Sequence, residues 1–170
     1  MKLASLILVV LFCLFSCKPS AELENNDQNS PKQDHFTWDN ATVYFLLTDR
    51  FYNGDPGNDG QHNPNAEPAP LRGFMGGDIK GVTDKLNEGY FTDLGVNAIW
   101  TTPVLENISG SVDEGTGMSY PFHGYWTRDW TKFDPRFASE EDFREFVQTA
   151  HKQGIRVIMD VIINHTGPVT

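Results

Sequence analysis

The stretch Gly154-Ile-Arg-Val-Ile-Met-Asp-Val-Ile-Ile-Asn-His165 decides the fold class of this sequence. Residues 155–163 within it are apolar and rich in β-branched side chains, which predicts a buried strand. The preceding residues predict a helix that begins at Ser139, a suitable N-cap, and ends at Gly154; its apolar face is Phe143, Phe146, Val147 and Ala150. A helix followed at once by a buried strand is typical of a βαβ unit.

The same order of elements extends toward the N-terminus. Strands are predicted at residues 42–47, which are apolar almost throughout and therefore expected to be buried on both faces, and at 97–100, before Pro103. Between them, apolar residues recur at three- and four-residue steps over 79–94, which predicts a helix closed by Gly95. A polar loop is expected over 105–120 and an aromatic-rich segment over 121–137. The alternation predicts an α/β fold with a parallel sheet.

The composition suits one soluble globular domain. Of the 170 residues, 39% are hydrophobic and 21% charged, which argues against a disordered chain, a collagen-like repeat or a multi-span membrane protein. The formal net charge is −10, from 13 Lys+Arg and 23 Asp+Glu. Nucleic acid is not expected as a partner, because binding phosphates requires a basic face. Cations and neutral ligands are compatible with this charge.

The N-terminus has the pattern of an export signal. Lys2, an apolar run over 3–15 and the small Ser16 predict a signal peptide over residues 1–16, with an apolar part too short to span a bilayer. Residues 14–17 resemble the lipobox of bacterial lipoproteins, which makes Cys17 the expected lipid anchor to a membrane or cell surface. The alternative is an ordinary secretory signal with two incidental thiols. Residues 17–36 are polar and are expected to form a flexible tether.

A Gly-rich loop after the first predicted strand carries four side chains with oxygen donors in seven residues: Asn53, Asp55, Asn58 and Asp59. Ca²⁺ takes six to eight oxygen ligands in flexible geometry, so this loop is a candidate metal site. Gly76-Gly77-Asp78 is a candidate to complete the shell. The loop is not an EF-hand, because the closing Glu at the twelfth position is absent. The alternative is plain Asx-turn chemistry.

Two further groups of residues could carry chemistry. Phe122-His-Gly-Tyr-Trp126 offers aromatic faces that suit sugar rings, or it only packs a loop onto the fold. Asn164 and His165 follow the last predicted strand, where parallel sheets place their ligand chemistry. The predicted strand includes Asp160. Because a carboxylate buried in an apolar strand is costly unless paired, its expected partner is a cation from a part of the fold that lies outside these 170 residues.

Residues 122–126, together with the Asp-x-x-x-Asn-His run at 160–165, resemble the alpha-amylase family of glycoside hydrolases. The resemblance is strongest to cyclodextrin glucanotransferase-like and maltogenic members, and it covers residues 41–168. It implies that residues 37–170 are the N-terminal part, with three strands, of a (β/α)₈ TIM barrel, a fold of about 250 residues. It also implies an enzyme acting on α-glucans by retaining double displacement.

The resemblance implies a role for individual residues. A first Ca²⁺ site matches Asn53, Asp55, Asn58, Asp59, the carbonyl of Gly76, and Asp78. Asn164 matches a ligand of a second Ca²⁺. The residues that match contacts to the sugar are Tyr125, as the aromatic platform at the cleaved bond, His123 and Trp126, which flank it, and His165, which hydrogen-bonds the sugar.

The resemblance leaves the reacting groups outside this chain. Asp160 matches a supporting carboxylate that orients an active-site arginine, while the nucleophile, the acid/base and that arginine are expected beyond Thr170. The 170-residue chain alone is therefore expected to be inactive. Hydrolysis and transglycosylation both remain open for the parent protein. The alternatives are a non-catalytic glucan-binding surface lipoprotein and an inactive truncated fragment.

Overall fold

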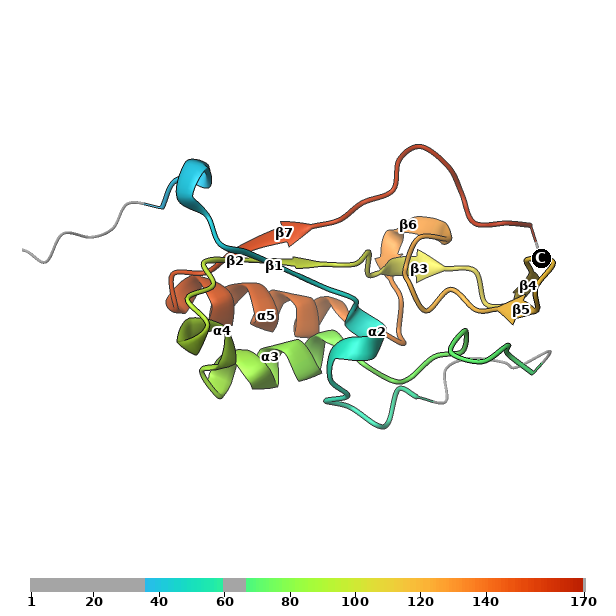
Figure 1. Cartoon of the computed structure of the whole chain (residues 1–170), viewed down its shortest axis with the longest axis horizontal. Coiled ribbons are helices and arrows are strands. Elements are labelled where there is room, and N and C mark those ends of the chain that lie inside the picture. Colours follow the sequence, from blue (N-terminus) through green and yellow to red (C-terminus); the bar gives the residue numbers. More distant parts are fainter. Residues whose placement is uncertain (1–35, 60–66, 170) are drawn as a thin grey trace, which may run out of the picture. The chain divides into compact units, whose positions relative to one another are not determined.

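A parallel sheet of three strands lies at the centre of the structure (Figure 1). The computed structural model describes residues 36–59 and 67–169. The order of the sheet is β1-β2-β7, with β1 at Val43–Leu46, β2 at Ala98–Thr101 and β7 at Arg156–Met159. The predicted signal peptide, Cys17 and the tether up to residue 35 lie outside the described residues.

Helices cover one face of this sheet, and the hydrophobic core lies between the two (Figure 1). Helices α3 (Ile79–Asn87) and α4 (Tyr90–Asp93) connect β1 to β2, and α5 (Glu140–Lys152) connects to β7, as parallel pairing requires. The core between sheet and helices includes Leu46, Ile79, Val82, Leu86, Phe91, Ile99, Phe146, Ala150 and Ile155. These crossovers confirm the predicted βαβ order. None of the described helices is both long and apolar enough to cross a membrane.

The opposite face of the sheet is not covered by the described residues, so the prediction that the first strand is buried on both faces is wrong. Val43 and Phe45 are 43% and 51% exposed, and Trp100 beside them in β2 is 38% exposed. Leu46 is buried and Tyr44 packs edge-on against Phe91 of α4. Side chains alternate along a strand, so only every second residue of β1 reaches the helices.

Two predicted elements are shorter than expected. The helix expected over 79–94 breaks at Gly89, whose φ of 84° lies in the left-handed region that glycine tolerates. The strand expected over 155–163 ends at Met159, which pairs with Thr101, the last residue of β2. The residues after Met159 have no ladder partner and leave the sheet. Asp160 therefore lies just past the strand rather than inside it.

The segment between β2 and α5 contains more regular structure than the predicted loop. Strand β3 (Leu105–Asn107) pairs antiparallel with β6 (Thr127–Phe133), and β4 (Val112–Asp113) pairs with β5 (Met118–Ser119). Ile108 and Tyr120 in this segment are buried. The remaining elements are the 3₁₀ turn η1 (Trp38–Asn40) and the short helix α2 (Thr48–Phe51).

The start of α5 confirms the predicted cap. The Ser139 hydroxyl accepts a hydrogen bond from the Asp142 N–H (3.1 Å), and the Asp142 carboxylate accepts one from the Ser139 N–H (2.8 Å). This capping box satisfies backbone donors that the first helical turn leaves without partners. The helix start is therefore determined locally, by two residues three positions apart.

Candidate functional site

The turn before β6 and the segment after β7 are held together at the carboxyl end of the sheet. The Tyr125 hydroxyl donates to Asp160 Oδ2 (3.2 Å), and His165 Nε2 lies 3.2 Å from the Tyr125 carbonyl oxygen. The Trp130 indole N–H donates to the Ile162 carbonyl (2.5 Å). The structure thus brings Tyr125, Asp160 and His165 into one cluster, although 35 and 40 residues separate the contacting pairs in the sequence.

His123 and Trp126 stand beside Tyr125, as expected. The His123 ring is stacked on Tyr125 (centroids 5.9 Å apart, interplanar angle 19°) and meets Trp126 edge-on at 4.8 Å. His123 Nδ1 accepts the Tyr125 backbone N–H (2.9 Å), so this nitrogen carries no proton. Burial lowers the pKa of His123, which agrees with a neutral ring. Its Nε2 then carries the proton and is the hydrogen-bond donor of the ring.

Asp160 has neutral hydrogen-bond donors as its partners. Its Oδ2 accepts from the Tyr125 hydroxyl and from the Trp100 indole N–H (3.2 Å each). Among the described residues no cation pairs with it, so the expected cationic partner is not found there. The pKa of Tyr125 is raised by burial and by the nearby Asp160 carboxylate, which keeps the phenol protonated as a donor.

The oxygen-rich loop after α2 folds back onto the start of α3. Asp78, the N-cap of α3, accepts hydrogen bonds from the Gly81 N–H (2.6 Å), the Asp55 N–H (2.8 Å) and the Asn58 amide (3.2 Å). A Cβ added to Gly81 would lie 2.0 Å from the Tyr52 carbonyl oxygen, so the backbone of the loop is in direct contact with the backbone of the helix. Asp78 thus joins the loop to α3.

Two side-chain oxygens of this loop are buried without a hydrogen-bond partner among the described residues: Asn53 Oδ1 and Asn58 Oδ1. The Asn53 amide nitrogen donates to both carboxylate oxygens of Asp59 (3.0 Å each). A Cβ on Gly76 would lie 2.5 Å from Asp59 Oδ1, so only glycine leaves this space open. Unpaired buried oxygens beside a carboxylate fit a hard cation such as Ca²⁺, because such an ion satisfies them.

Two other predicted metal ligands, Asp55 and Asn164, lie in different environments. Asp55 Oδ1 accepts the Gly57 N–H (2.9 Å), which is the Asx-turn chemistry of the alternative interpretation. Asn164 is exposed, and its role at a second Ca²⁺ stays a prediction. The described residues contain no group of three His, Cys, Asp or Glu side chains that could hold a metal. The side-chain oxygens of the loop come from two amides, Asn53 and Asn58, and two carboxylates, Asp55 and Asp59.

Asp49 is a buried carboxylate whose role the sequence interpretation missed. It is 2% exposed and accepts the Met75 N–H at 2.9 Å, while its backbone carbonyl accepts the Gly77 N–H (2.9 Å). Burial raises the pKa of Asp49 to about 6, against the lowering effects of the hydrogen bonds from the Met75 and Gly76 N–H groups and of Arg50. Asp49 is recognisable in the sequence as a polar residue that follows a strand, but its partner Met75 lies 26 residues further along the chain. Asp49 holds the segment that contains Gly76.

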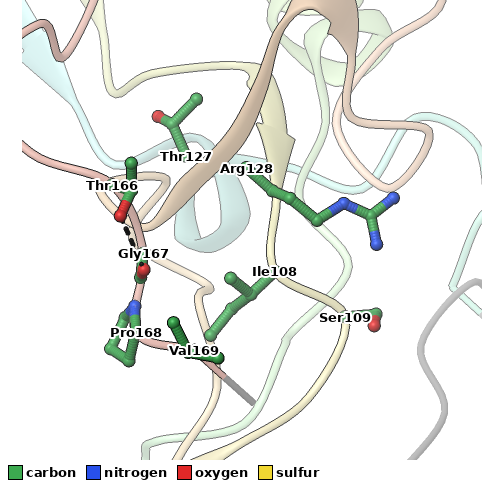
Figure 2. A pocket seen from close by; sticks show the side chains of 8 residues that line it. All are labelled: Ile108, Ser109, Thr127, Arg128, Thr166, Gly167, Pro168 and Val169. Atoms are coloured by element: carbon green, nitrogen blue, oxygen red, sulfur yellow. Dashed lines mark hydrogen bonds between the residues drawn. The ribbon is translucent and has the colours of Figure 1, made fainter.

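A cavity of about 340 Å³ adjoins the cluster without containing it (Figure 2). Its walls are Ile108 and Ser109, Thr127 and Arg128, and the segment from Thr166 to Val169. Neither Tyr125 nor Asp160 lines it. The Tyr125 cluster, rather than this cavity, therefore has the chemistry that the sequence predicts for sugar contact.

Comparison with known proteins identifies the family. The sequence model described as "Alpha amylase, catalytic domain" matches residues 45–170. The chain belongs to the alpha-amylase family. This confirms the resemblance found in the sequence.

Several relatives share this part of the alpha-amylase catalytic domain. The chain is 46% identical over 155 residues to the periplasmic alpha-amylase of Escherichia coli (strain K12), covering 88% of this chain and 22% of the relative. It is 40% identical over 141 residues to the cyclomaltodextrin glucanotransferase of Geobacillus stearothermophilus, covering 80% and 19%. The crystal structure of the cyclomaltodextrin glucanotransferase CldA superposes with a TM-score of 0.68 at 40% identity, covering 76% of this chain and 27% of that one. The chain thus spans about a fifth of the length of these curated relatives.

Proposed function

We propose that this chain is the N-terminal part, with the first three strands, of a (β/α)₈ catalytic barrel that acts on α-glucans such as starch and maltooligosaccharides. The observation that carries the proposal is the cluster of Tyr125, Asp160 and His165 at the carboxyl end of the sheet, in a chain of the alpha-amylase family. Barrel enzymes place their active sites at this end of the strands. The relatives named above include both an alpha-amylase and glucanotransferases.

Within this proposal the chain binds and orients the sugar. The Tyr125 ring supplies an apolar face for the sugar ring, and the His123 Nε2–H and His165 supply polar contacts to hydroxyl groups. Trp126 packs edge-on against His123 and limits its movement. Holding the sugar in a fixed pose lowers the entropic part of the barrier.

The two reacting carboxyl groups are assigned to later strands, outside these 170 residues. A retaining mechanism needs two carboxyl groups about 5–5.5 Å apart, one as nucleophile and one as acid/base. Asp160 instead accepts hydrogen bonds from Tyr125 and Trp100 through its Oδ2, so we assign it a supporting role. Water as the acceptor then gives hydrolysis, and a sugar hydroxyl gives transglycosylation.

The isolated 170-residue chain is expected to bind maltooligosaccharides weakly and to release no new reducing ends, since it lacks the carboxyl pair. The measurement is a reducing-sugar assay on the purified chain, with the E. coli periplasmic alpha-amylase as positive control. Turnover that co-purifies with the chain and is lost in Tyr125→Ala would overturn the assignment of the chemistry to later strands. A protein that contains the rest of the barrel and binds maltooligosaccharides without turnover would point to the non-catalytic glucan-binding alternative.

Ca²⁺ is proposed as the resident cation of the loop that ends at Asp59. Asn53, Asn58 and Asp59 would hold it with their side-chain oxygens and Gly76 with its carbonyl, while Asp55 and Asp78 shape the loop. When bound, the cation supplies the positive charge that these buried oxygens lack. The proposal rests on the two unpaired Asn oxygens.

Removal of Ca²⁺ with EDTA is expected to lower the melting temperature. Saturation at about 100 times the dissociation constant stabilises the native state by about 2.7 kcal/mol. Thermal unfolding with and without added Ca²⁺ measures this difference. Asp59→Ala should abolish the response, whereas Asp39→Ala, which removes the same charge from an exposed position outside the loop, should keep it. An unchanged melting curve in wild type would contradict the site.

Export and lipid anchoring are proposed for the N-terminal part of the sequence. The support is the signal-like pattern up to Cys17 and the similarity to a relative named as periplasmic. Mass spectrometry of the mature protein is expected to find a lipidated Cys17 as the first residue. An unmodified N-terminus at another residue would contradict the anchor and favour an ordinary secretory signal.

A further inference from the structure

Asn107, the last residue of β3, is 1% exposed, and its side-chain oxygen, its side-chain nitrogen and its backbone N–H all have hydrogen-bond partners. Its side-chain oxygen accepts the Trp126 backbone N–H (2.8 Å), and its amide nitrogen donates to the Leu105 carbonyl (2.8 Å). Its own N–H donates to Asp134 Oδ2 (3.0 Å). Another side chain would not satisfy the same partners, and a buried polar group without a partner costs free energy.

The Asn107 side chain compensates for an irregular ladder between β3 and β6, which run side by side (Figure 1). Leu105 pairs with Phe133, but the next two residues pair with Asp129 and Thr127, so the register shifts twice. Such shifts leave backbone groups without ladder partners. The carboxamide takes the place of a backbone peptide here, because it has one donor and one acceptor group in similar geometry.

The hydrogen bond from Trp126 concerns the site directly. The Trp126 N–H and the Tyr125 carbonyl belong to one planar peptide unit, so fixing the N–H fixes the carbonyl on the opposite side. That carbonyl oxygen lies 3.2 Å from His165 Nε2. The next peptide is fixed as well, since the Trp126 carbonyl accepts the Ile108 N–H (3.0 Å). Asn107 thus fixes the orientation of the peptide unit between Tyr125 and Trp126, whose carbonyl oxygen contacts His165.

Asn107 is itself anchored to a buried ion pair. Asp134, which accepts its N–H, is bound by the Arg136 guanidinium at 2.7 Å (Nε) and 2.5 Å (Nη2). Asp134 is 0% and Arg136 is 7% exposed. Arg136 also donates to the Ile108 carbonyl (3.2 Å), so the ion pair holds both Asn107 and the residue that follows it.

We propose that Asn107 is a positioning residue that orients Tyr125 and His165 relative to each other without touching the sugar. The inference concerns how the cluster of the proposed function is held, and it rests on that function for its effect on activity. It predicts a selective loss of order at Trp126 when the carboxamide is removed.

The test compares three variants of the whole protein by amide hydrogen exchange and by kinetics on maltooligosaccharides. Asn107→Ala is expected to speed exchange of the Trp126 amide at least tenfold, while the Thr102 amide, bonded to Leu46 in the sheet, stays protected. It should lower kcat/KM about tenfold at a temperature where the variant is fully folded. Asn107→Asp keeps an acceptor for Trp126 but removes the donor to the Leu105 carbonyl, so it should retain more of the Trp126 protection and of kcat/KM than Asn107→Ala.

Leu86→Ala is the matched control, because it truncates a fully buried core residue of α3 outside the cluster. It should destabilise the protein, speed exchange at both amides together and leave kcat/KM of the folded protein unchanged. If Asn107→Ala does not fold, Asn107→Ser, which keeps a shorter polar group, is compared in its place.

The outcomes separate this inference from the proposed function. Faster Trp126 exchange with unchanged kcat/KM would reduce Asn107 to a structural residue and overturn the inference. Unchanged exchange would also overturn it. If the wild-type protein neither binds nor turns over maltooligosaccharides, the proposed function fails, while the exchange measurement still decides whether Asn107 orders the peptide at Trp126.

Discussion

Replacing Tyr125 with alanine is expected to lower kcat/KM of the whole protein on maltooligosaccharides about 100-fold, the size of effect that a misplaced reacting group produces. Three contacts are lost together. The sugar loses the aromatic face, His123 loses the ring stacked on it, and Asp160 loses the Tyr125 hydroxyl. Steady-state kinetics on a series of maltooligosaccharides measures the change.

One further variant separates the contribution of the Tyr125 hydroxyl from that of the ring, and another serves as the control. Tyr125→Phe keeps the ring and removes only the hydroxyl that donates to Asp160, so it should retain most of the binding and lose part of kcat. Tyr52→Ala is the control, because this tyrosine is 43% exposed and its ring contacts the Lys85 ammonium rather than the cluster. It should leave kcat/KM unchanged. Kinetics of Tyr125→Ala equal to those of wild type would reject Tyr125 as a substrate contact.

Asp134→Ala is expected to lower the free energy of unfolding by about 3–5 kcal/mol, because it leaves the buried Arg136 without its counter-charge. The guanidinium makes two hydrogen bonds to Asp134 and also lies over the Phe74 ring. The change also removes the acceptor for the Asn107 N–H. Denaturation with urea measures the difference.

The matched comparison is the ion pair of Arg144 and Glu140 on the surface of α5, whose side chains are 65% and 74% exposed. Arg144→Ala should cost less than about 1 kcal/mol, because water screens exposed pairs. If Asp134→Ala proved as mild as Arg144→Ala, the buried pair would contribute little and the anchor of Asn107 would lose its support.

The local parts of the fold were predictable from the sequence. The capping box at Ser139 and the order of strands and helices rest on residues close together in the chain, and the structure confirms them. The break at Gly89 was missed because the apolar spacing continues across it, to Phe91 on α4. The early end of β7 was missed because it depends on where the neighbouring β2 ends.

The candidate site was predictable as a set of residue types but not as a set of contacts. The aromatic turn and the Asp-x-x-x-Asn-His run were recognisable, yet the donors that Trp100 and Tyr125 supply to Asp160 were not predicted, because these residues lie 60 and 35 positions away in the sequence. Asn107 gave no signal, and Asp49 was recognisable only as a polar residue that follows the first strand. Each acts on residues 19 to 26 positions away, and periodicity does not report such pairs.

The contact between Gly54 and Gly81 has a consequence for recombination between family members. A Cβ on Gly54 would lie 2.3 Å from the Gly81 nitrogen, and Asp78 bonds both stretches. A crossover point placed between residues 59 and 76 would join a loop from one parent to a helix start from another. Residues 53–59 and 76–81 therefore behave as one inherited block.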